Sequence, residues 1–277
     1  MTASLILCYR AGAVATLMLN NPPLNVITLE LTRALSATLE TLAADESVRA
    51  LVLTGVGERA FCAGSDIGEF GPLMAPGRVI PGKLARQHEV FGRLDHFPKP
   101  TVAAISGLAL GGGLEIAVCC DLLVVDEHAR LGLPEIKLGV FPSSGGPVRL
   151  TRRIGENRAK EMMFLGEPID AATGLAWGLV NRVVPRGQSL HAAQALAAVL
   201  ATRPPRALRY CKRAIDLAFD ATEDDALRQA LVLSDLAFSS SECREGVRAF
   251  LAKESPHFGP DRGDIAAPPL SDESRQE

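Results

Sequence analysis

The chain has 277 residues, of which 47% are hydrophobic, 22% are charged and 5% are aromatic. This much aliphatic material can bury a large core, which excludes a disordered chain. The formal net charge of −3 gives no electrostatic reason to expect a nucleic acid or an anionic membrane surface as a partner.

Up to residue 187 the sequence alternates between predicted strands and predicted helices. Apolar runs predict buried strands at residues 13–19, 50–54, 101–105 and 122–125. Thr28 can cap a helix whose leucines recur every three or four residues. These leucines are Leu31, Leu35, Leu39 and Leu42. Strands that alternate with helices indicate an α/β core with mostly parallel strand pairing.

After Pro185 the pattern changes to helices alone. We expect helices at residues 188–202, 205–219, 222–239 and 242–253. The chain therefore divides into a core over 1–187 and a helical region over 188–258. Helices that cannot bury a face on their own core often bury it on another subunit, so we expect an oligomer. Residues 259–277 are rich in Pro, Gly and charge and are predicted to form a disordered tail.

Hydropathy and cysteine usage favour a cytoplasmic protein with no membrane span. Residues 102–120 approach the ~20 apolar residues that cross a bilayer. They contain Gly111-Gly112-Gly113 and the ionisable Glu115, so we expect a strand, a glycine turn and a buried helix there instead. The six cysteines include no C-x-x-C pair, and no secretory leader pattern is present, which predicts reduced thiols.

Two segments with small residues each follow a predicted buried strand. They are Ala60-Phe61-Cys62-Ala63-Gly64-Ser65-Asp66 and Gly107-Leu108-Ala109-Leu110-Gly111-Gly112-Gly113-Leu114-Glu115. Turns of this kind let backbone amides face a cavity, and the second also opens a helix N-terminus. Two amides that converge from separate turns would form an oxyanion hole. The alternative is that the glycines only allow close packing between a helix and a strand.

Other motifs carry weaker signals. Residues 55–60 (Gly-Val-Gly-Glu-Arg-Ala) fit a dinucleotide fingerprint, but another glycine turn follows instead of a helix. The histidines and cysteines show no ligand spacing, so we predict no metal. Ser143-Ser144 lacks the G-x-S-x-G frame of a nucleophilic serine. The basic residues between 203 and 213 have little aromatic interleaving, so we favour a solvated helix face or a contact with phosphates over RNA binding.

Taken in order with further segments, the glycine turns resemble the crotonase (enoyl-CoA hydratase/isomerase) superfamily. The other matching segments are 99–104 (Lys-Pro-Thr-Val-Ala-Ala), 120–121, 133–142 (Leu-Pro-Glu-Ile-Lys-Leu-Gly-Val-Phe-Pro), 145–150, 174–180 and 183–185. The resemblance is dense over 13–185, loose over 186–258 and absent from the tail. It implies an α/β spiral of ββα turns with a C-terminal helical trimerisation region, and homotrimers or dimers of trimers. It also implies acyl-CoA thioester substrates, with coenzyme A as part of the substrate and no separate cofactor.

The resemblance assigns catalytic roles to four residues. The oxyanion amides correspond to Ser65 and Gly112, and the two acids that flank the α,β-double bond correspond to Glu115 and Glu135. One acid activates the water that adds at Cβ, and the other delivers a proton to Cα. Apolar neighbours are expected to raise at least one carboxyl pKa. Outside this family the same glutamates would be interpreted as a helix N-terminal carboxylate and a surface loop acid.

Three functions follow from these assignments. Hydration needs both acids, so their retention favours an enoyl-CoA hydratase, or the reverse dehydratase. A Δ3,Δ2-enoyl-CoA isomerase can work with Glu135 alone and is the second hypothesis. A non-catalytic protein that binds CoA or RNA and keeps the fold is the third.

Further residues are predicted to bind the substrate. Phe70, Leu73 and Met74 belong to a Gly- and Pro-rich loop, residues 67–82, and are expected to line or cover the acyl pocket, with an ordinary surface loop as the alternative. Lys253 corresponds to a C-terminal lysine that meets the adenosine phosphate in the family, unless it is only a solvated lysine at a helix end. The other predicted contacts are Ala63, Gly64, Asp66, Ile67, Gly111 and Pro134.

Two positions depart from the common pattern of the superfamily. Gly68 stands where many members have a lysine that contacts the nucleotide. Pro147 and Val148 follow Gly145-Gly146 where Thr and Gln are common, a variation that is similar to the carnitinyl-CoA dehydratase branch. These departures leave the acyl group of the substrate open.

Overall fold

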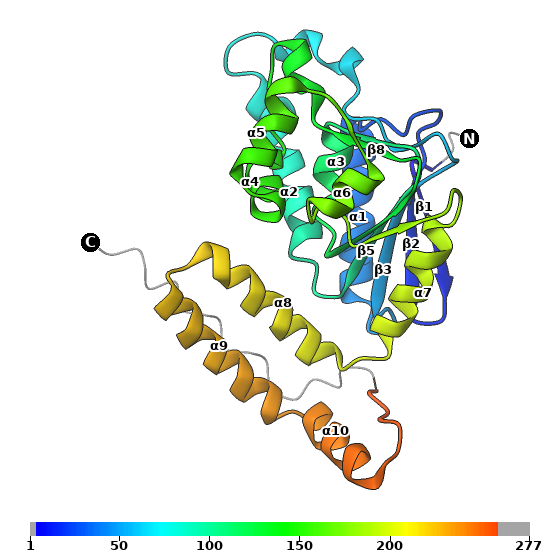
Figure 1. The fold of residues 1–277 in the computed structure, drawn as a ribbon, viewed down its shortest axis with the longest axis vertical. Helices are drawn as coiled ribbons and strands as arrows, with labels where there is room; N and C mark the ends of the chain where they lie inside the picture. The colour runs from blue at the N-terminus through cyan, green and yellow to red at the C-terminus, as the bar shows by residue number, and fades with distance from the viewer. Residues whose placement is uncertain (1–3, 260–277) are drawn as a thin grey trace. The chain divides into compact units, whose positions relative to one another are not determined.

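The computed structural model describes residues 4–259, and within them the strands form two sheets (Figure 1). In spatial order the six-stranded sheet contains β1 (Ile6–Ala11), β2 (Val14–Leu19), β3 (Ala50–Gly55), β5 (Thr101–Ile105), β7 (Leu122–Asp126) and β10 (Arg182–Val184). The four-stranded sheet contains β4 (Ala60–Cys62), β6 (Leu108–Leu110), β8 (Arg130–Gly132) and β9 (Ile169–Asp170). Only the pairs β1–β2 and β8–β9 are antiparallel, so the predicted parallel core is confirmed within these residues.

Consecutive strands alternate between the two sheets, and this builds the spiral. β3 is followed by β4, β5 by β6 and β7 by β8. The helices that come next are α2 (Ala85–Asp95), α3 (Gly112–Ala117) and α4 (Gly146–Ile154). α5 (Glu156–Leu165) and α6 (Ala171–Ala176) complete the turn that starts at β7. The expected ββα spiral is therefore confirmed.

The larger sheet separates two apolar layers, because successive side chains of a strand point to opposite faces. Leu51 and Leu53 of β3 pack in the cluster that holds α2 and α1 (Leu29–Ala44). Ala50 and Val52 pack on the other face, against α7 (Ser189–Ala201). The predicted cap of α1 is confirmed, since Thr28 Oγ1 accepts a hydrogen bond from Leu31 N at 3.0 Å. All four predicted leucines of α1 are buried.

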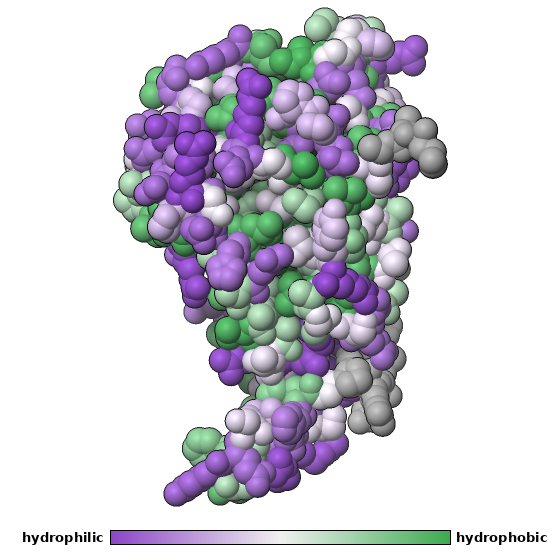
Figure 2. Space-filling model, turned by 90° about the vertical axis from the view of Figure 1, so that its right-hand side faces the viewer, coloured by the Kyte–Doolittle hydropathy of each residue, from purple (hydrophilic) through white to green (hydrophobic). Residues whose placement is uncertain are grey.

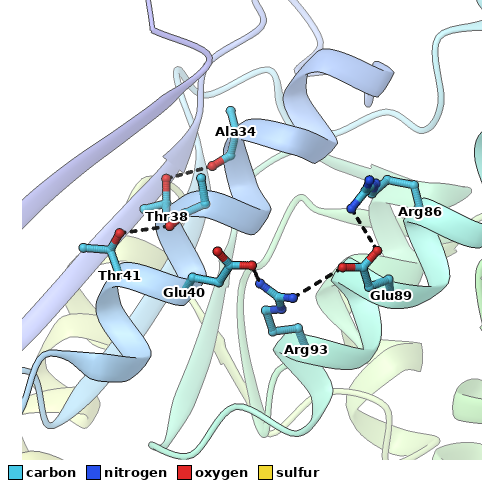
Figure 3. Close-up of polar contacts among 8 residues, drawn as sticks. Ala34, Thr38, Glu40, Thr41, Arg86, Glu89 and Arg93 are labelled. Atoms are coloured by element: carbon cyan, nitrogen blue, oxygen red, sulfur yellow. Dashed lines mark hydrogen bonds and ion pairs between the residues drawn. The ribbon is translucent and has the colours of Figure 1, made fainter.

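Ion pairs join α1 and α2 at the surface above this core (Figure 3). Arg93 of α2 contacts Glu40 of α1 and Glu89 of its own helix, and Arg86 donates to Glu89 at 2.9 Å. Such exposed pairs each contribute only ~0–1 kcal/mol. The buried apolar side chains between the helices therefore hold α2 in place, and α2 fixes the far end of the segment that leaves the first glycine turn.

The chain divides into two compact units, the first ending at Ala201 and the second beginning at Thr202. The division falls after α7, whereas the expected core ended at residue 187. α7 belongs to the first unit because Ala193 and Ala197, one helical turn apart, are fully buried on the sheet. Small side chains at this spacing let a helix approach a sheet closely.

The second unit consists of three helices within the described residues. They are α8 (Pro205–Asp220), α9 (Glu223–Phe238) and α10 (Ser241–Ala252), which confirms the helices predicted after residue 204. Glu242 of α10 accepts hydrogen bonds from Arg206 N at the start of α8 at 3.1 Å. Apart from Gly259, the tail predicted for residues 259–277 lies outside the described residues.

Large apolar side chains remain exposed on these helices. They include Ile215, Leu227, Leu231, Phe238, Phe250 and Leu251. Hydrophobic side chains are also visible among hydrophilic ones on the face shown in Figure 2. None of the helices within residues 4–259 is both long enough and apolar enough to cross a membrane. Residues 102–120 form β5, β6 and α3 instead, as predicted.

Candidate active site

The two glycine turns lie against each other. β4 and β6 are paired in parallel, so the chain leaves both strands at the same edge of the smaller sheet. A Cβ on Gly64 would lie 3.9 Å from Gly112 N, and a Cβ on Gly112 would lie 3.6 Å from Ser65 N. The amides of Ser65 and Gly112 therefore come to one place from two separate turns.

Hydrogen bonds on either side of Ser65 orient its amide. Ile27 N donates to Gly64 O at 2.8 Å, and Asp66 N donates to Ile27 O at 3.0 Å. In a bridge of this kind the N–H of the central residue points away from the partner strand. Within residues 4–259 the Ser65 N–H donates no hydrogen bond.

The Gly112 amide belongs to the first turn of α3, where helical N–H groups have no partner inside the helix. Leu114 N and Glu115 N both donate to Gly111 O, at 2.8 and 2.9 Å. Gly111 has a φ of 52°, which favours glycine over residues with a side chain. In the described part of the chain the Gly112 N–H makes no hydrogen bond, so two N–H donors are available at the meeting point of the turns.

Glu115 lies in the same helical turn, and its side chain is only 3% exposed. Its Oε1 accepts hydrogen bonds from Ser144 N at 2.7 Å and Gly146 N at 2.8 Å. A Cβ on Gly146 would lie 2.9 Å from this oxygen. Burial raises the pKa of Glu115, and the two amides oppose that effect by stabilising the charged form. The carboxylate is therefore buried, oriented and held by backbone donors.

Glu135 lies beside it, in the 3-10 turn Pro134–Leu138. A Cβ on Gly111 would lie 2.8 Å from Glu135 Oε1, so the side chain reaches back over the second glycine turn. Oε2 is buried and accepts no hydrogen bond from any described residue. Burial, followed by the charge of Glu115, raises the pKa of Glu135 to about 7. A carboxyl with this pKa can give or take a proton at neutral pH.

The segment after Ser65 is less irregular than the predicted loop 67–82. It contains 3-10 turns at Ile67–Glu69 and Gly71–Leu73 and enters a π-helical turn, Ile80–Leu84, that leads into α2. Phe70 and Leu73 are half-buried, whereas Ile67 and Met74 are 57% and 77% exposed. Of these four residues, only Phe70 and Leu73 therefore pack against other side chains within the described part of the chain.

The remaining predicted contacts occupy different settings. Ala63 N donates to Leu24 O at 2.9 Å, and Asp66 caps the turn that follows it through Gly68 N at 2.9 Å. Pro134 opens the turn that carries Glu135. Lys253 lies in the second unit, at the C-terminal cap of α10, and its contact with a substrate stays a prediction. No three His, Cys, Asp or Glu side chains within residues 4–259 are grouped to hold a metal ion.

One residue near the site was missed by sequence reasoning. Lys83 is only 7% exposed, and its Nζ lies 4.4 Å from the centroid of the Phe70 ring. Its charge interacts with those of Glu69, Glu115, Asp66 and Glu135. A lysine between Pro81-Gly82 and Leu84 has the pattern of a solvated loop residue, so only its place in an otherwise apolar stretch could have marked it.

Comparisons with known proteins identify the family of the chain. The family model for enoyl-CoA hydratase/isomerase matches residues 10–261. The 2,3-dehydroadipyl-CoA hydratase of Escherichia coli is 37% identical over 90% of this chain and 96% of the relative, and the short-chain-enoyl-CoA hydratase of Clostridium acetobutylicum is 33% identical over 90% and 95%. The crystal structure of an enoyl-CoA hydratase from Bacillus anthracis superimposes with a TM-score of 0.87 at 32% identity, covering 92% of this chain and 98% of the other. The chain is thus an enzyme that belongs to the enoyl-CoA hydratase/isomerase family.

Proposed function

We propose that this enzyme adds water across the α,β-double bond of an acyl-CoA thioester, or runs the reverse dehydration. The observation that carries the proposal is the arrangement around Gly111. Two backbone N–H groups without partners in the described chain, from Ser65 and Gly112, lie next to the buried Glu115 and the half-buried Glu135. Each group matches a separate requirement of hydration.

The two amides serve the thioester oxygen. When a nucleophile adds at Cβ, negative charge develops on that oxygen, and fixed N–H dipoles stabilise the charge without having to reorganise. The loss of one such donor typically lowers the rate by ~100–1,000-fold. The neighbouring contacts expected at Ala63, Gly64 and Gly111 hold the acyl group in this position.

The two carboxyls divide the proton transfers. Glu115 accepts two backbone hydrogen bonds that favour its ionised form, so it acts as the base that takes a proton from water as the oxygen bonds to Cβ. Glu135, whose pKa is about 7, gives its proton to Cα as the double bond is lost. One water is added in total, and exchange with solvent returns the proton from Glu115 to Glu135.

Substitution of each acid tests the assignment. Glu115→Gln and Glu135→Gln should each abolish hydration while the affinity for a saturated acyl-CoA is retained. Glu161→Gln, which changes an exposed acid of α5, is the matched control and should keep full activity. Mass spectrometry of products from an enoyl-CoA panel separates the functions, since hydration adds the mass of one water and isomerisation adds none. Full isomerase activity in Glu115→Gln would replace the hydratase by the one-acid isomerase.

We also propose a cytoplasmic homotrimer or dimer of trimers, assembled through α8 to α10. The exposed apolar side chains of these helices support an intersubunit surface, and the six free cysteines suit a reducing compartment. Lys253 is proposed to meet the adenosine phosphate of coenzyme A. Light scattering should give a mass of three or six chains, and a stable monomer would contradict the assembly.

A further inference from the structure

Lys83 places an ammonium group beside the residues expected to bind the acyl chain. It belongs to the π-helical turn Ile80–Leu84, and its Nζ lies 4.4 Å from the centre of the Phe70 ring. The same turn packs against Leu73, because a Cβ on Gly82 would lie 2.7 Å from Leu73 Cδ2. Both aromatic and aliphatic partners of this turn are among the residues predicted to line the acyl pocket.

This ammonium group has no polar partner among the described residues. Lys83 is 7% exposed, and within residues 4–259 its Nζ makes no hydrogen bond and no ion pair. Burial accordingly lowers the pKa of Lys83. The ring of Phe70 offers partial compensation through a cation–π contact, but no described residue accepts a hydrogen bond from Lys83. A charge that is partly desolvated and unpaired by the protein is costly to the folded state.

Two of the acids whose charges act on Lys83 are already engaged with backbone amides. Asp66 Oδ1 accepts from Gly68 N at 2.9 Å, and both oxygens of Glu69 accept from Leu29 N at 3.2 Å, where they cap α1. These carboxylates influence Lys83 through their charge but do not bond to it. Among residues 4–259 the cation therefore has no counter-ion at hydrogen-bond distance.

The two catalytic carboxyls do not fill that role either. Glu115 is tied by its Oε1 to Ser144 N and Gly146 N. Glu135 has a pKa of about 7, so it is protonated in a large share of molecules at neutral pH. The combined charge of the two carboxyls is therefore less negative than −2, which reduces the repulsion of an anionic substrate.

We propose that Lys83 binds a carboxylate at the far end of the substrate's acyl group, so that the enzyme prefers CoA thioesters of unsaturated dicarboxylic acids. The proposal rests on the proposed enoyl-CoA chemistry. An unsubstituted alkyl chain would desolvate the ammonium further and leave its donors unused. A carboxylate would supply charge-assisted hydrogen bonds in a site of low dielectric, where such bonds are strongest.

The test compares two substrates of equal chain length, 2-hexenedioyl-CoA and 2-hexenoyl-CoA. The wild-type enzyme should favour the dicarboxylic substrate in kcat/KM. Lys83→Met, which keeps the length and apolar stem of the side chain, should lower the ratio of the two kcat/KM values by about 10- to 100-fold, the effect of one hydrogen bond to a charged group. Lys160→Met, at an exposed lysine of α5 paired with Glu156, is the control and should leave the ratio unchanged.

Three results would overturn the proposal. The first is a wild-type enzyme that hydrates 2-hexenoyl-CoA without preferring the dicarboxylic substrate. The second is an unchanged ratio in Lys83→Met. The third is a larger dependence on Lys83 for 6-hydroxy-2-hexenoyl-CoA than for 2-hexenedioyl-CoA, which would assign the lysine to a neutral oxygen.

A binding measurement separates this proposal from the function on which it rests. If no enoyl-CoA is hydrated, the proposed function fails, but calorimetry with hexanedioyl-CoA and hexanoyl-CoA still reports the contribution of Lys83. A preference for hexanedioyl-CoA that is lost in Lys83→Met supports the carboxylate site, and equal affinities contradict it. Lys83→Met is expected to fold, because it removes a partly desolvated charge that no described residue pairs, and circular dichroism checks this.

Discussion

Two neighbouring regions of the site are built differently. The inner turns, residues 63–65 and 111–115, follow strands of the smaller sheet and are fixed by backbone hydrogen bonds. The outer segment, residues 67–84, consists of short helical turns with several exposed apolar side chains. The groups proposed for chemistry lie in the first region, apart from Glu135, and those proposed for acyl selection lie in the second. A sheet edge fixed by backbone hydrogen bonds can thus hold one reaction geometry, while the outer segment is proposed to select the substrate.

The largest effect is expected where the inner turns touch. A Cβ on Gly113 would lie 2.0 Å from Cys62 O and 2.7 Å from Cys62 C, both backbone atoms. Gly113→Ala must therefore push the turns apart and separate the two oxyanion amides. We expect a loss of more than about 1,000-fold in kcat/KM, or failure to fold, measured by hydration rate and thermal unfolding.

Gly92→Ala provides the matched control for this substitution. Gly92 lies within α2, and a Cβ there would meet nothing within 4 Å. Alanine at this position should stabilise the protein by roughly 0.5–1 kcal/mol and keep its activity. If Gly113→Ala behaved like Gly92→Ala, the close approach of the two turns would have no role in catalysis.

A smaller loss is expected from moving Glu115 without removing it. A Cβ on Gly146 would lie 2.9 Å from Glu115 Oε1 and 2.9 Å from Pro142 Cβ. Gly146→Ala should therefore displace the carboxylate from its backbone donors and lower kcat by about 100-fold, with a smaller change in KM. Steady-state kinetics measures this split. A rise in KM alone would mean that the 144–146 segment positions substrate and not the acid.

These predictions also show which features could be read from the sequence. Long runs with clear periodicity, such as the leucines of α1 and the helices after residue 204, were predicted close to their observed bounds. The three-residue strands β4, β6 and β8 were not, because so short a strand has no measurable period. α2 was missed because only Gln87, Val90, Phe91 and Leu94 are buried along it. The pairing of these elements depends on contacts between distant residues, which local patterns do not contain.

Some features of the site could likewise be predicted from the sequence, and others could not. The two turns and both glutamates were predicted as site residues because their order along the chain is specific to the family. The hydrogen bonds that Ser144 N and Gly146 N donate to Glu115 were not predicted, because any residue type can supply a backbone donor. Lys83 was missed because its burial depends on how residues 80–84 fold over Phe70.

The pH profile should show the titration of Glu135. As proton donor, Glu135 must be protonated, and its pKa is raised to about 7 by burial and by the charge of Glu115. The hydration rate should therefore be maintained below pH 7 and should fall about tenfold per pH unit above it. Rates measured from pH 5 to 9 with a saturating thioester test this limb. A rate that stays constant up to pH 9 would show that Glu135 does not supply the proton.

The smallest effect is expected in the outer segment, at Met74. Its side chain is 77% exposed, so Met74→Ser should change the free energy of unfolding by no more than about 0.5 kcal/mol. If this segment covers the acyl chain when substrate binds, the substitution should lower kcat/KM a few-fold more for a ten-carbon enoyl-CoA than for a four-carbon one, because only the longer chain reaches it. Denaturant titration and kinetics with both thioesters measure the two effects. A stability loss of several kcal/mol, or an equal kinetic effect on both chain lengths, would erase the distinction between a region that holds the reaction and one that selects the substrate.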